Sequence, residues 1–209
     1  MKYNVVKNAS SINNYGDRLV KNPTSYKGRW KDLFGNNNPI CLELGTGRGS
    51  FIIEMAKNHP NINYIGLEYD QNQIATAASK ASSAKLDNLK LILADARNIV
   101  NFFGKEIDTI YLTFSEPWPR KADEKKRFTH ESYLRLYDRI FKKHKHIIMK
   151  TDNIDLYAYS ICSLSEYGYV IKDASLDLHS REEFNVMTEY EKKFSADGIK
   201  INYLKAVKK

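Results

Sequence analysis

Short apolar runs alternate with longer amphipathic segments through the middle of the chain, and this alternation restricts the fold more than any other feature. The apolar runs are rich in Ile, Leu and Tyr, which is typical of strands buried on both faces of a parallel sheet. The segments between them have helical periodicity. The expected strands are residues 39–44, 63–67, 89–93, 107–113 and 146–150, and the expected helices are residues 50–57, 71–84, 96–103, 130–142 and 153–166.

The pattern changes after Gly168, a residue that favours a helix end. Two extended runs follow, residues 170–178 and 199–207, and we expect them to pair as an antiparallel edge. The polar residues 1–38 are expected to form an N-terminal arm that leads into the sheet. The sequence therefore predicts one α/β domain over residues 1–209, a doubly wound, mostly parallel seven-stranded sheet with an antiparallel C-terminal edge.

Composition narrows the classes of protein that this chain can belong to. Lys and Arg number 33 against 25 Asp and Glu, and this net charge of +8 would attract phosphates, although lysine-rich proteins without a nucleic-acid role share it. No apolar stretch is long enough to span a membrane, and the start lacks the apolar segment of a secretory signal, so we expect a cytoplasmic protein. Cys41 and Cys162 are expected to be reduced core residues, not a disulfide or a metal site.

A glycine-rich turn, Glu43-Leu-Gly-Thr-Gly-Arg-Gly-Ser, follows the first expected strand and opens a helix. In doubly wound sheets this position binds nucleotides. The glycines at 45, 47 and 49 miss the dinucleotide pattern, because Ser50 stands at its third glycine position. Glu43 would repel a pyrophosphate but favour a cation, such as the sulfonium and amino groups of S-adenosyl-L-methionine. A nicotinamide-dependent oxidoreductase on the same fold is disfavoured by both observations and stays an alternative.

Two further acidic residues follow the next two expected strands. Glu68 lies where this architecture holds a ribose diol, and Asp95 is placed near the adenine. Each of them could instead be a solvated carboxylate or a helix N-cap. Their occurrence at successive strand ends favours a shared cofactor site.

A stiff loop, Ser115-Glu-Pro-Trp-Pro-Arg, follows the fourth expected strand. In S-adenosylmethionine enzymes of this architecture, that loop faces the transferable methyl group. Trp118 could stack on a base and Glu116 could accept hydrogen bonds from a purine, although Trp118 could equally pack the loop onto the sheet. Candidate phosphate contacts are the basic segment 120–127 with Arg29, Lys31, Lys142, Lys143 and Lys145.

Together with the glycine turn and this loop, Lys150-Thr-Asp-Asn and Thr188-Glu-Tyr-Glu-Lys-Lys-Phe occur in an order and spacing that resembles the bacterial tRNA (guanine-N(7)-)-methyltransferase family. The resemblance covers nearly the whole chain from Asn22 onward. It implies a Rossmann-like class I methyltransferase that modifies N7 of a variable-loop guanine, tRNA nucleotide position 46. It implies cofactor contacts at Glu43, Gly45, Gly47, Gly49, Glu68, Asp95 and Glu116, and tRNA contacts at Arg120, Asp152, Thr188, Glu189, Tyr190 and Glu191.

The chain departs from the family pattern near the expected site. Glu116 stands where the family usually has Asp, and Ala122 and Asp123 replace the usual Arg and His. Because guanine N7 is already nucleophilic, we expect Glu116 to be the catalytic residue by orienting the base and stabilising its developing charge, not by removing a proton. The departures leave open an RNA-binding relative with weakened catalysis, and the sequence does not choose between a monomer and a homodimer.

Overall fold

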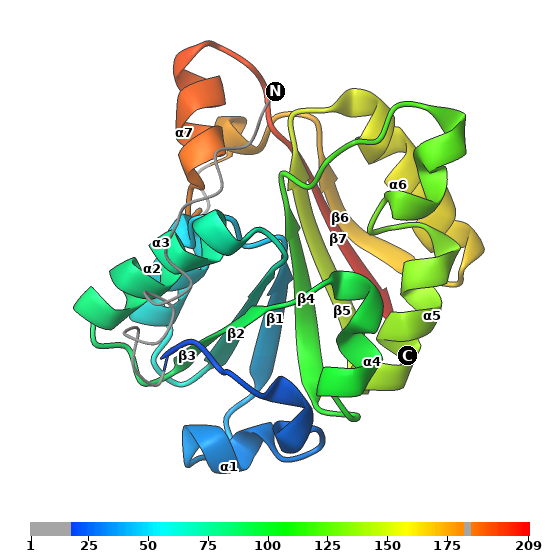
Figure 1. Cartoon of the computed structure of the whole chain (residues 1–209). Coiled ribbons are helices and arrows are strands. Elements are labelled where there is room, and N and C mark those ends of the chain that lie inside the picture. Colours follow the sequence, from blue (N-terminus) through cyan, green and yellow to red (C-terminus); the bar gives the residue numbers. More distant parts are fainter. Residues whose placement is uncertain (1–17, 182–184) are drawn as a thin grey trace.

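The computed structural model describes residues 18–181 and 185–209, and its strands form one sheet in the order β3-β2-β1-β4-β5-β7-β6 (Figure 1). Strands β1 to β5 are parallel, whereas β7 is antiparallel to both β5 and β6. The predicted mostly parallel α/β sheet with an antiparallel C-terminal edge is confirmed. The strands are β1 (Ile40–Leu44), β2 (Asn63–Glu68), β3 (Leu89–Leu93), β4 (Ile107–Thr113), β5 (Phe141–Thr151), β6 (Val170–Ser175) and β7 (Asn202–Lys208).

Four of the five expected helices form as single helices, while the segment 96–103 divides into a 3-10 turn and a short α-helix. They are α2 (Ser50–Asn58), α3 (Gln71–Ser83), η4 (Ala96–Asn98), α4 (Ile99–Phe102), α5 (Glu131–Ile140) and α6 (Ile154–Glu166). The sequence reading missed the shorter elements, which have too few turns to show a helical period. These are η3 (Pro23–Tyr26), α1 (Trp30–Phe34), η5 (Lys121–Lys126), η6 (Leu178–Ser180) and α7 (Glu189–Ala196).

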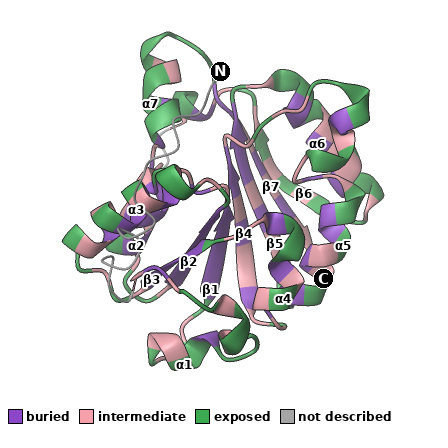
Figure 2. Ribbon diagram, viewed as in Figure 1, coloured by how far each residue is buried: buried purple, intermediate pink, exposed green. Residues whose placement is uncertain are grey.

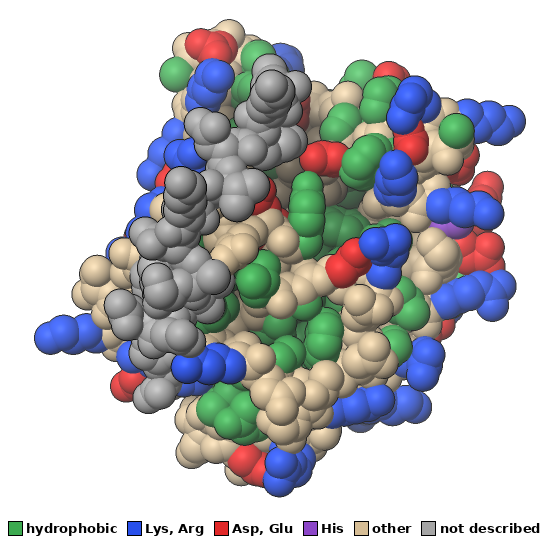
Figure 3. All heavy atoms as spheres, viewed as in Figure 1, with side chains coloured by type: hydrophobic (Ala, Val, Ile, Leu, Met, Phe, Trp, Pro, Cys, Tyr) green, Lys and Arg blue, Asp and Glu red, His purple; other side chains and the backbone are tan. Residues whose placement is uncertain are grey.

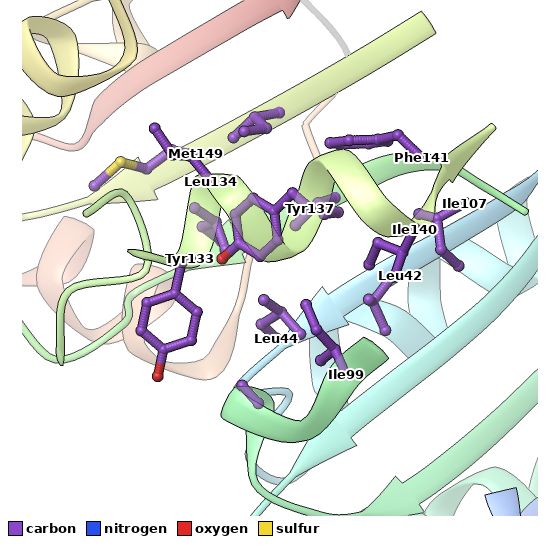
Figure 4. Packing of buried hydrophobic residues seen from close by; sticks show 14 of the residues in the cluster. Leu42, Leu44, Ile99, Ile107, Tyr133, Leu134, Tyr137, Ile140, Phe141 and Met149 are labelled. Carbon is purple, nitrogen blue, oxygen red and sulfur yellow. The ribbon is translucent and has the colours of Figure 1, made fainter. Parts of the chain in front are cut away.

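Two hydrophobic clusters lie on opposite faces of the sheet, because successive strand residues point to opposite sides. Leu42 and Leu44 of β1 point into the cluster under α4, α5 and α6, whereas Cys41 points into the cluster under α2 and α3. Figure 2 shows the strands buried between these helices, and Figure 4 shows Tyr133, Tyr137 and other α5 side chains packed over the sheet. This double covering leaves the carboxyl ends of the parallel strands as the edge where a site can form.

Strand β5 begins five residues earlier than expected, and the preceding helix ends at Ile140 instead of Lys142. The chain passes directly from helix to strand at Phe141, which has extended dihedral angles, pairs with Ile107 and is buried. Burial of Phe141 therefore fixes the boundary. The five basic or imidazole residues that follow it, residues 142–146, lie in the first half of the strand, although residues 143–145 were expected to connect helix and strand.

The described part of the first 38 residues packs against the sheet. Leu19 bridges to Leu91 beside β3, and Trp30 is fully buried with its ring centre 5.4 Å from that of Phe103. The Trp30 indole also donates a hydrogen bond of 2.9 Å to the Phe102 carbonyl. This segment thus completes one end of the core.

The expectation for the two cysteines was half right. Both are free thiols and Cys41 is buried, but Cys162 is exposed on α6. The inward face of α6 is formed by residues such as Leu156, Ser160 and Leu164, so helical geometry turns Cys162 to solvent. Across residues 18–181 and 185–209, the helices are too short or too polar to cross a bilayer.

Candidate active site

A cleft of about 270 Å³ opens at the carboxyl ends of β1 and β4, between the glycine turn and the start of α7. It brings together segments that lie far apart in the sequence. Among the predicted residues, the cleft is lined by Glu43, Gly45, Gly47, Thr188, Glu189 and Tyr190. The sequence reading did not assign a site role to other lining residues, which are Thr46, Arg48, Ser50, Phe51, Gln73, Thr113, Phe114 and Lys193.

The glycine turn, residues 45–49, uses its glycines for two different purposes. All three have positive φ angles, 73° at Gly45, 55° at Gly47 and 77° at Gly49, which L side chains rarely adopt. A Cβ atom at Gly49 would lie 2.8 Å from the Ala77 Cβ, so this glycine permits close packing of α2 on α3. A Cβ at Gly47 would meet nothing nearer than the Gln73 side chain at 3.9 Å. Gly47 therefore keeps open backbone toward the cleft.

Glu43 lies at the floor of the cleft and is almost completely buried. The hydroxyls of Thr46 and Thr113 donate hydrogen bonds to its two carboxylate oxygens. Burial raises the pKa of Glu43 from 4.5 to about 7, although the threonine hydroxyls and Lys150 oppose this rise. A cation in the cleft would favour the ionised carboxylate, because opposite charges attract strongly where water is excluded.

Glu68 and Asp95 follow β2 and β3, at the same edge of the sheet as the cleft, but neither lines it. Glu68 is buried and accepts hydrogen bonds from the backbone N–H groups of Gly47, Tyr69 and Asp70, each at 2.9 Å. Glu68 thus holds the glycine turn in place. Its proposed contact with a ribose remains a prediction.

Asp95 caps the 3-10 turn η4 by accepting a hydrogen bond of 2.8 Å from the Arg97 N–H. The Arg97 guanidinium also contacts both carboxylate oxygens and lowers the pKa of Asp95. Asp95 is therefore a helix N-cap, which was one of its predicted roles. Contact with an adenine remains a prediction.

The loop after β4, residues 114–119, has left-handed φ angles on bulky residues, whereas the glycine turn has them on glycines. Phe114 and Trp118 have φ angles of 51° and 44°, in the left-handed region that bulky residues avoid. The Phe114 N–H donates to the Lys150 carbonyl at 2.9 Å, which ties the loop to β5. Glu116 is exposed, and its carboxylate has no hydrogen-bond partner among the described residues. The loop therefore presents an unpaired carboxylate beside the cleft residue Phe114.

Trp118 does not line the cleft, and one face of its ring lies near the Lys126 ammonium, 4.5 Å from the ring centre. The expected exposed basic loop is in fact the 3-10 helix η5, organised around an acid. Asp123 is buried and accepts from Arg120 at 2.7 Å and from Lys126 at 2.7 Å. Two of the basic side chains predicted to bind phosphate are thus paired with Asp123.

The motif Thr188 to Glu191 forms the beginning of α7, which was expected to be a polar connection. Thr188 caps the helix by accepting from the Glu191 N–H at 2.9 Å, and the Glu191 carboxylate reaches back to the Thr188 N–H. This Thr-x-x-Glu capping box was a readable sequence signal for a helix start. Tyr190 points out of the helix, with its ring centre 6.5 Å from that of Phe114, and both line the cleft.

Lys150 at the end of β5 and Glu191 on α7 form a buried ion pair at 3.2 Å. Burial lowers the pKa of Lys150 in spite of the neighbouring carboxylates. For Glu191 burial acts in the opposite direction, but Lys150, Asn185 and His179 together hold its pKa below the usual value. Asp152, two residues after Lys150, is exposed.

The lysines at the start of β5 lie at the opposite end of the sheet from the cleft, on the side of α1 (Figure 1). From Lys143 to Asp152 the strand advances nine residues, or roughly 30 Å. Figure 3 shows Lys and Arg mainly around the rim of one face, with hydrophobic side chains gathered nearer its centre. Any phosphate contact of Lys142, Lys143 or Lys145 would therefore be remote from the reacting group.

Comparison with known proteins identifies the chain's relatives. Residues 37–204 match a family model described as putative methyltransferase. A tRNA (guanine-N(7)-)-methyltransferase of Geobacillus sp. (strain WCH70) is 48% identical, with 90% of this chain and 86% of that protein covered. One of Bacillus cytotoxicus is also 48% identical, with 93% and 91% covered.

Solved structures agree with the observed fold. A structure described as an antibiotic-related methyltransferase has a TM-score of 0.61 at 22% identity, covering 87% of this chain and 92% of that chain. The 16S rRNA methyltransferase KamB has a TM-score of 0.64 at 14% identity, covering 86% and 92%. At these identities the likeness extends to the fold alone.

Proposed function

Because this chain belongs to the family of bacterial tRNA (guanine-N(7)-)-methyltransferases, we propose that it transfers a methyl group from S-adenosyl-L-methionine to N7 of a variable-loop guanine in tRNA. The observation that supports this most strongly is the cleft itself. The glycine turn, the end of β4 and the Thr188 motif meet there around the buried Glu43. A tRNA substrate also agrees with the net charge of +8.

The residues of the cleft suit a cationic nucleoside cofactor. Glu43 supplies a carboxylate on the floor, the open backbone at Gly47 permits close approach, and Phe114 and Tyr190 supply flat apolar walls. A pyrophosphate would meet the Glu43 carboxylate, which argues against a nicotinamide cofactor. When bound, S-adenosyl-L-methionine supplies an electrophilic methyl group on a sulfonium.

The protein's task is then mainly to position the base. The lone pair of guanine N7 is available without proton removal, so the ring must be held about 3 to 3.5 Å from the methyl carbon and in line with the sulfur. Glu116, exposed on the constrained loop, can accept hydrogen bonds from the donor edge of the guanine. Its charge also favours the positive charge that develops on the ring. We assign catalysis to Glu116 on this basis.

Recognition of the RNA is proposed to depend on shape and phosphate contacts, with the target guanine turned out of its stack. Arg120 and Asp152 follow β4 and β5 in the chain and are proposed to contact the tRNA. The cytoplasm, where tRNA is available, is the proposed location.

The test is transfer of labelled methyl from S-adenosyl-L-methionine to unmodified tRNA transcripts, with the product nucleotide mapped. We expect label at one variable-loop guanine, and a decrease in kcat of about 100-fold or more in Glu116→Ala, with cofactor affinity retained. Glu116→Asp, which restores the usual family residue, should retain activity. Binding of both ligands by the wild type without any labelled RNA would instead identify an inactive RNA-binding relative.

A further inference from the structure

The Glu191 carboxylate is completely buried, although the family resemblance implies that it contacts the substrate. Its Oε1 atom interacts with the Asn185 amide at 2.6 Å and with His179 Nε2 at 2.8 Å. Its Oε2 atom accepts from Lys150 Nζ at 3.2 Å and from the Thr188 N–H at 3.3 Å. A carboxylate offers about four lone-pair positions, and here each oxygen already has two partners. No acceptor position is left for a base or a ribose.

These contacts join α7 to three other parts of the chain. Lys150 belongs to β5, His179 to η6, and Asn185 to the segment that precedes α7. The Lys150 ammonium also contacts the Asn185 amide oxygen and donates to the Val186 carbonyl at 2.9 Å. His179 holds α7 at a second point, because its Nδ1 lies 2.9 Å from Ser195 Oγ. Glu191 is thus the centre of the network that docks α7 on the sheet.

The residues on either side of this anchor face the cleft. Tyr190 stacks near Phe114, and Glu189 receives hydrogen bonds from Lys80 and Ser50, each at 2.5 Å. Lys80 lies on α3 and Ser50 begins α2, so Glu189 spans the cleft mouth from α7 to the helices behind the glycine turn. In Figure 1, α7 extends beyond the strand ends. Besides this bridge and the Glu191 network, α7 contacts the β4 loop through Phe194, whose ring centre lies 6.0 Å from that of Phe114.

We propose that Glu191 is a positioning residue, which with Lys150 fixes α7 so that Glu189 and Tyr190 border the cofactor cleft, and that it does not itself contact substrate. The inference deepens the proposed function, on which its kinetic readout rests, whereas its binding and spectroscopic readouts do not depend on methyl transfer. The ion pair between Lys150 and Glu191 also links the Lys150-Thr-Asp-Asn motif with the Thr188 to Glu191 motif.

The test compares Glu191→Gln, Lys150→Met and the double variant Lys150→Met/Glu191→Leu, with Asp197→Asn as an acid-to-amide control at the exposed end of the same helix. We measure cofactor Kd by calorimetry, tRNA KM and kcat separately, and fluorescence of a Tyr190→Trp reporter in each background. Removing one member of a buried ion pair strands the other charge, whereas replacing both with apolar residues avoids this cost.

We expect each single variant to weaken cofactor binding and raise the tRNA KM by about tenfold, and to expose the reporter to quencher. The double variant strands no charge but still lacks the Glu191 contacts to His179 and Asn185, so it should lie between the single variants and the wild type in these three readouts. Asp197→Asn should match the wild type. A direct substrate contact would give another pattern. Glu191→Gln would then raise the tRNA KM alone, Lys150→Met would resemble the wild type, and the double variant would show no recovery.

The same set of variants distinguishes a folding defect from a loss of function. If a single variant fails to fold, the double variant and its reporter decide the proposal, because the apolar pair leaves no buried charge. If the wild type binds cofactor but methylates no RNA, the proposed function fails while cofactor Kd and reporter exposure still test the anchor.

Discussion

The two loops that border the cleft are built in opposite ways. The glycine turn after β1 places its positive φ angles on glycines, and its conformation is held by the buried acids Glu43 and Glu68. The loop after β4 places positive φ angles on Phe114 and Trp118, and its one carboxylate, Glu116, is exposed. The N–H groups of Gly45, Thr46, Gly47 and Gly49 in the first loop are hydrogen-bonded, whereas the second loop has left-handed φ angles on bulky residues and presents an unpaired charge.

This difference indicates how the two halves of the site work. A cofactor loop whose backbone is already held by hydrogen bonds to buried neighbours is preorganised, so little free energy is spent on ordering it. Strained backbone persists only where the surrounding structure enforces it, and such strain is often found at functional sites. We therefore expect the glycine turn to bind the cofactor and the β4 loop to position the base.

The largest effect on stability is expected at Gly49. Alanine there would be strained by about 1 to 2 kcal/mol in the left-handed region and would overpack Ala77 by about 1 to 3 kcal/mol more. Gly47→Ala lacks the clash and should cost only about 1 kcal/mol, but its methyl group would enter the cleft and weaken cofactor binding. Urea unfolding and calorimetry of both variants check this division, and equal losses of stability would contradict it.

The Glu43 carboxyl should make stability depend on pH. Since its folded pKa of about 7 exceeds the unfolded 4.5, its stabilising contribution is complete below pH 4.5 and is lost as pH rises through 7. The difference corresponds to about 3 kcal/mol between pH 4.5 and 8. Urea unfolding of Glu43→Gln over this range should lack that loss.

Cofactor binding provides a second measure of the same group. A cationic ligand favours ionised Glu43, so the affinity of the wild type should rise between pH 6 and 8, whereas that of Glu43→Gln should stay flat. An identical pH profile in the two proteins would show that Glu43 does not face the ligand's charge.

A substitution in the β4 loop should affect the tRNA KM and not the cofactor Kd. Loss of a stacking surface is worth about 1 to 3 kcal/mol, so Trp118→Ala should raise the tRNA KM by about tenfold and leave cofactor Kd unchanged. Trp118→Phe keeps an aromatic face and serves as the matched control. If the ring only packs the loop, Trp118→Ala will lower the free energy of unfolding and leave the tRNA KM unchanged.

The smallest effect is expected at Asp123, which pairs with Arg120 and Lys126. Asp123→Asn would release both cations for phosphate contact. We expect tRNA binding to tighten by about threefold at low salt, and the slope of log K against log salt to steepen by about one to two. Titrations at several salt concentrations measure both quantities, and an unchanged slope would show that neither cation reaches the RNA.

The sequence by itself was sufficient for much of the fold and for the choice of site. The strands Leu89–Leu93 and Ile107–Thr113 are short and largely apolar runs, and their bounds were predicted without error, while those of β1 and β2 differ by one residue. The glycine turn was also predicted correctly, because glycines at alternate positions directly after a strand are typical of a ligand-binding turn. Glu43, Gly45 and Gly47 therefore lie where they were expected, at the cleft.

Elements fixed by distant contacts could not be read in this way. The α7 helix is short and polar, and its position depends on Lys150, 41 residues before Glu191 in the chain. Its capping box was visible, but a cap does not show what the helix packs against. The start of β5 similarly depends on pairing of Phe141 with Ile107.

The sequence determined which residue types reach the site, because apolar periodicity and glycine placement are local properties of the chain. Only the tertiary structure decided what each polar residue does there. Glu191, Asp123 and Glu116 are all acids with a basic residue or a proline within two positions in the sequence, yet the first two are buried and paired while the third is exposed and unpaired. The reason is physical: the role of a carboxylate is set by its burial and by the donors around it, and these come from segments that only folding brings together.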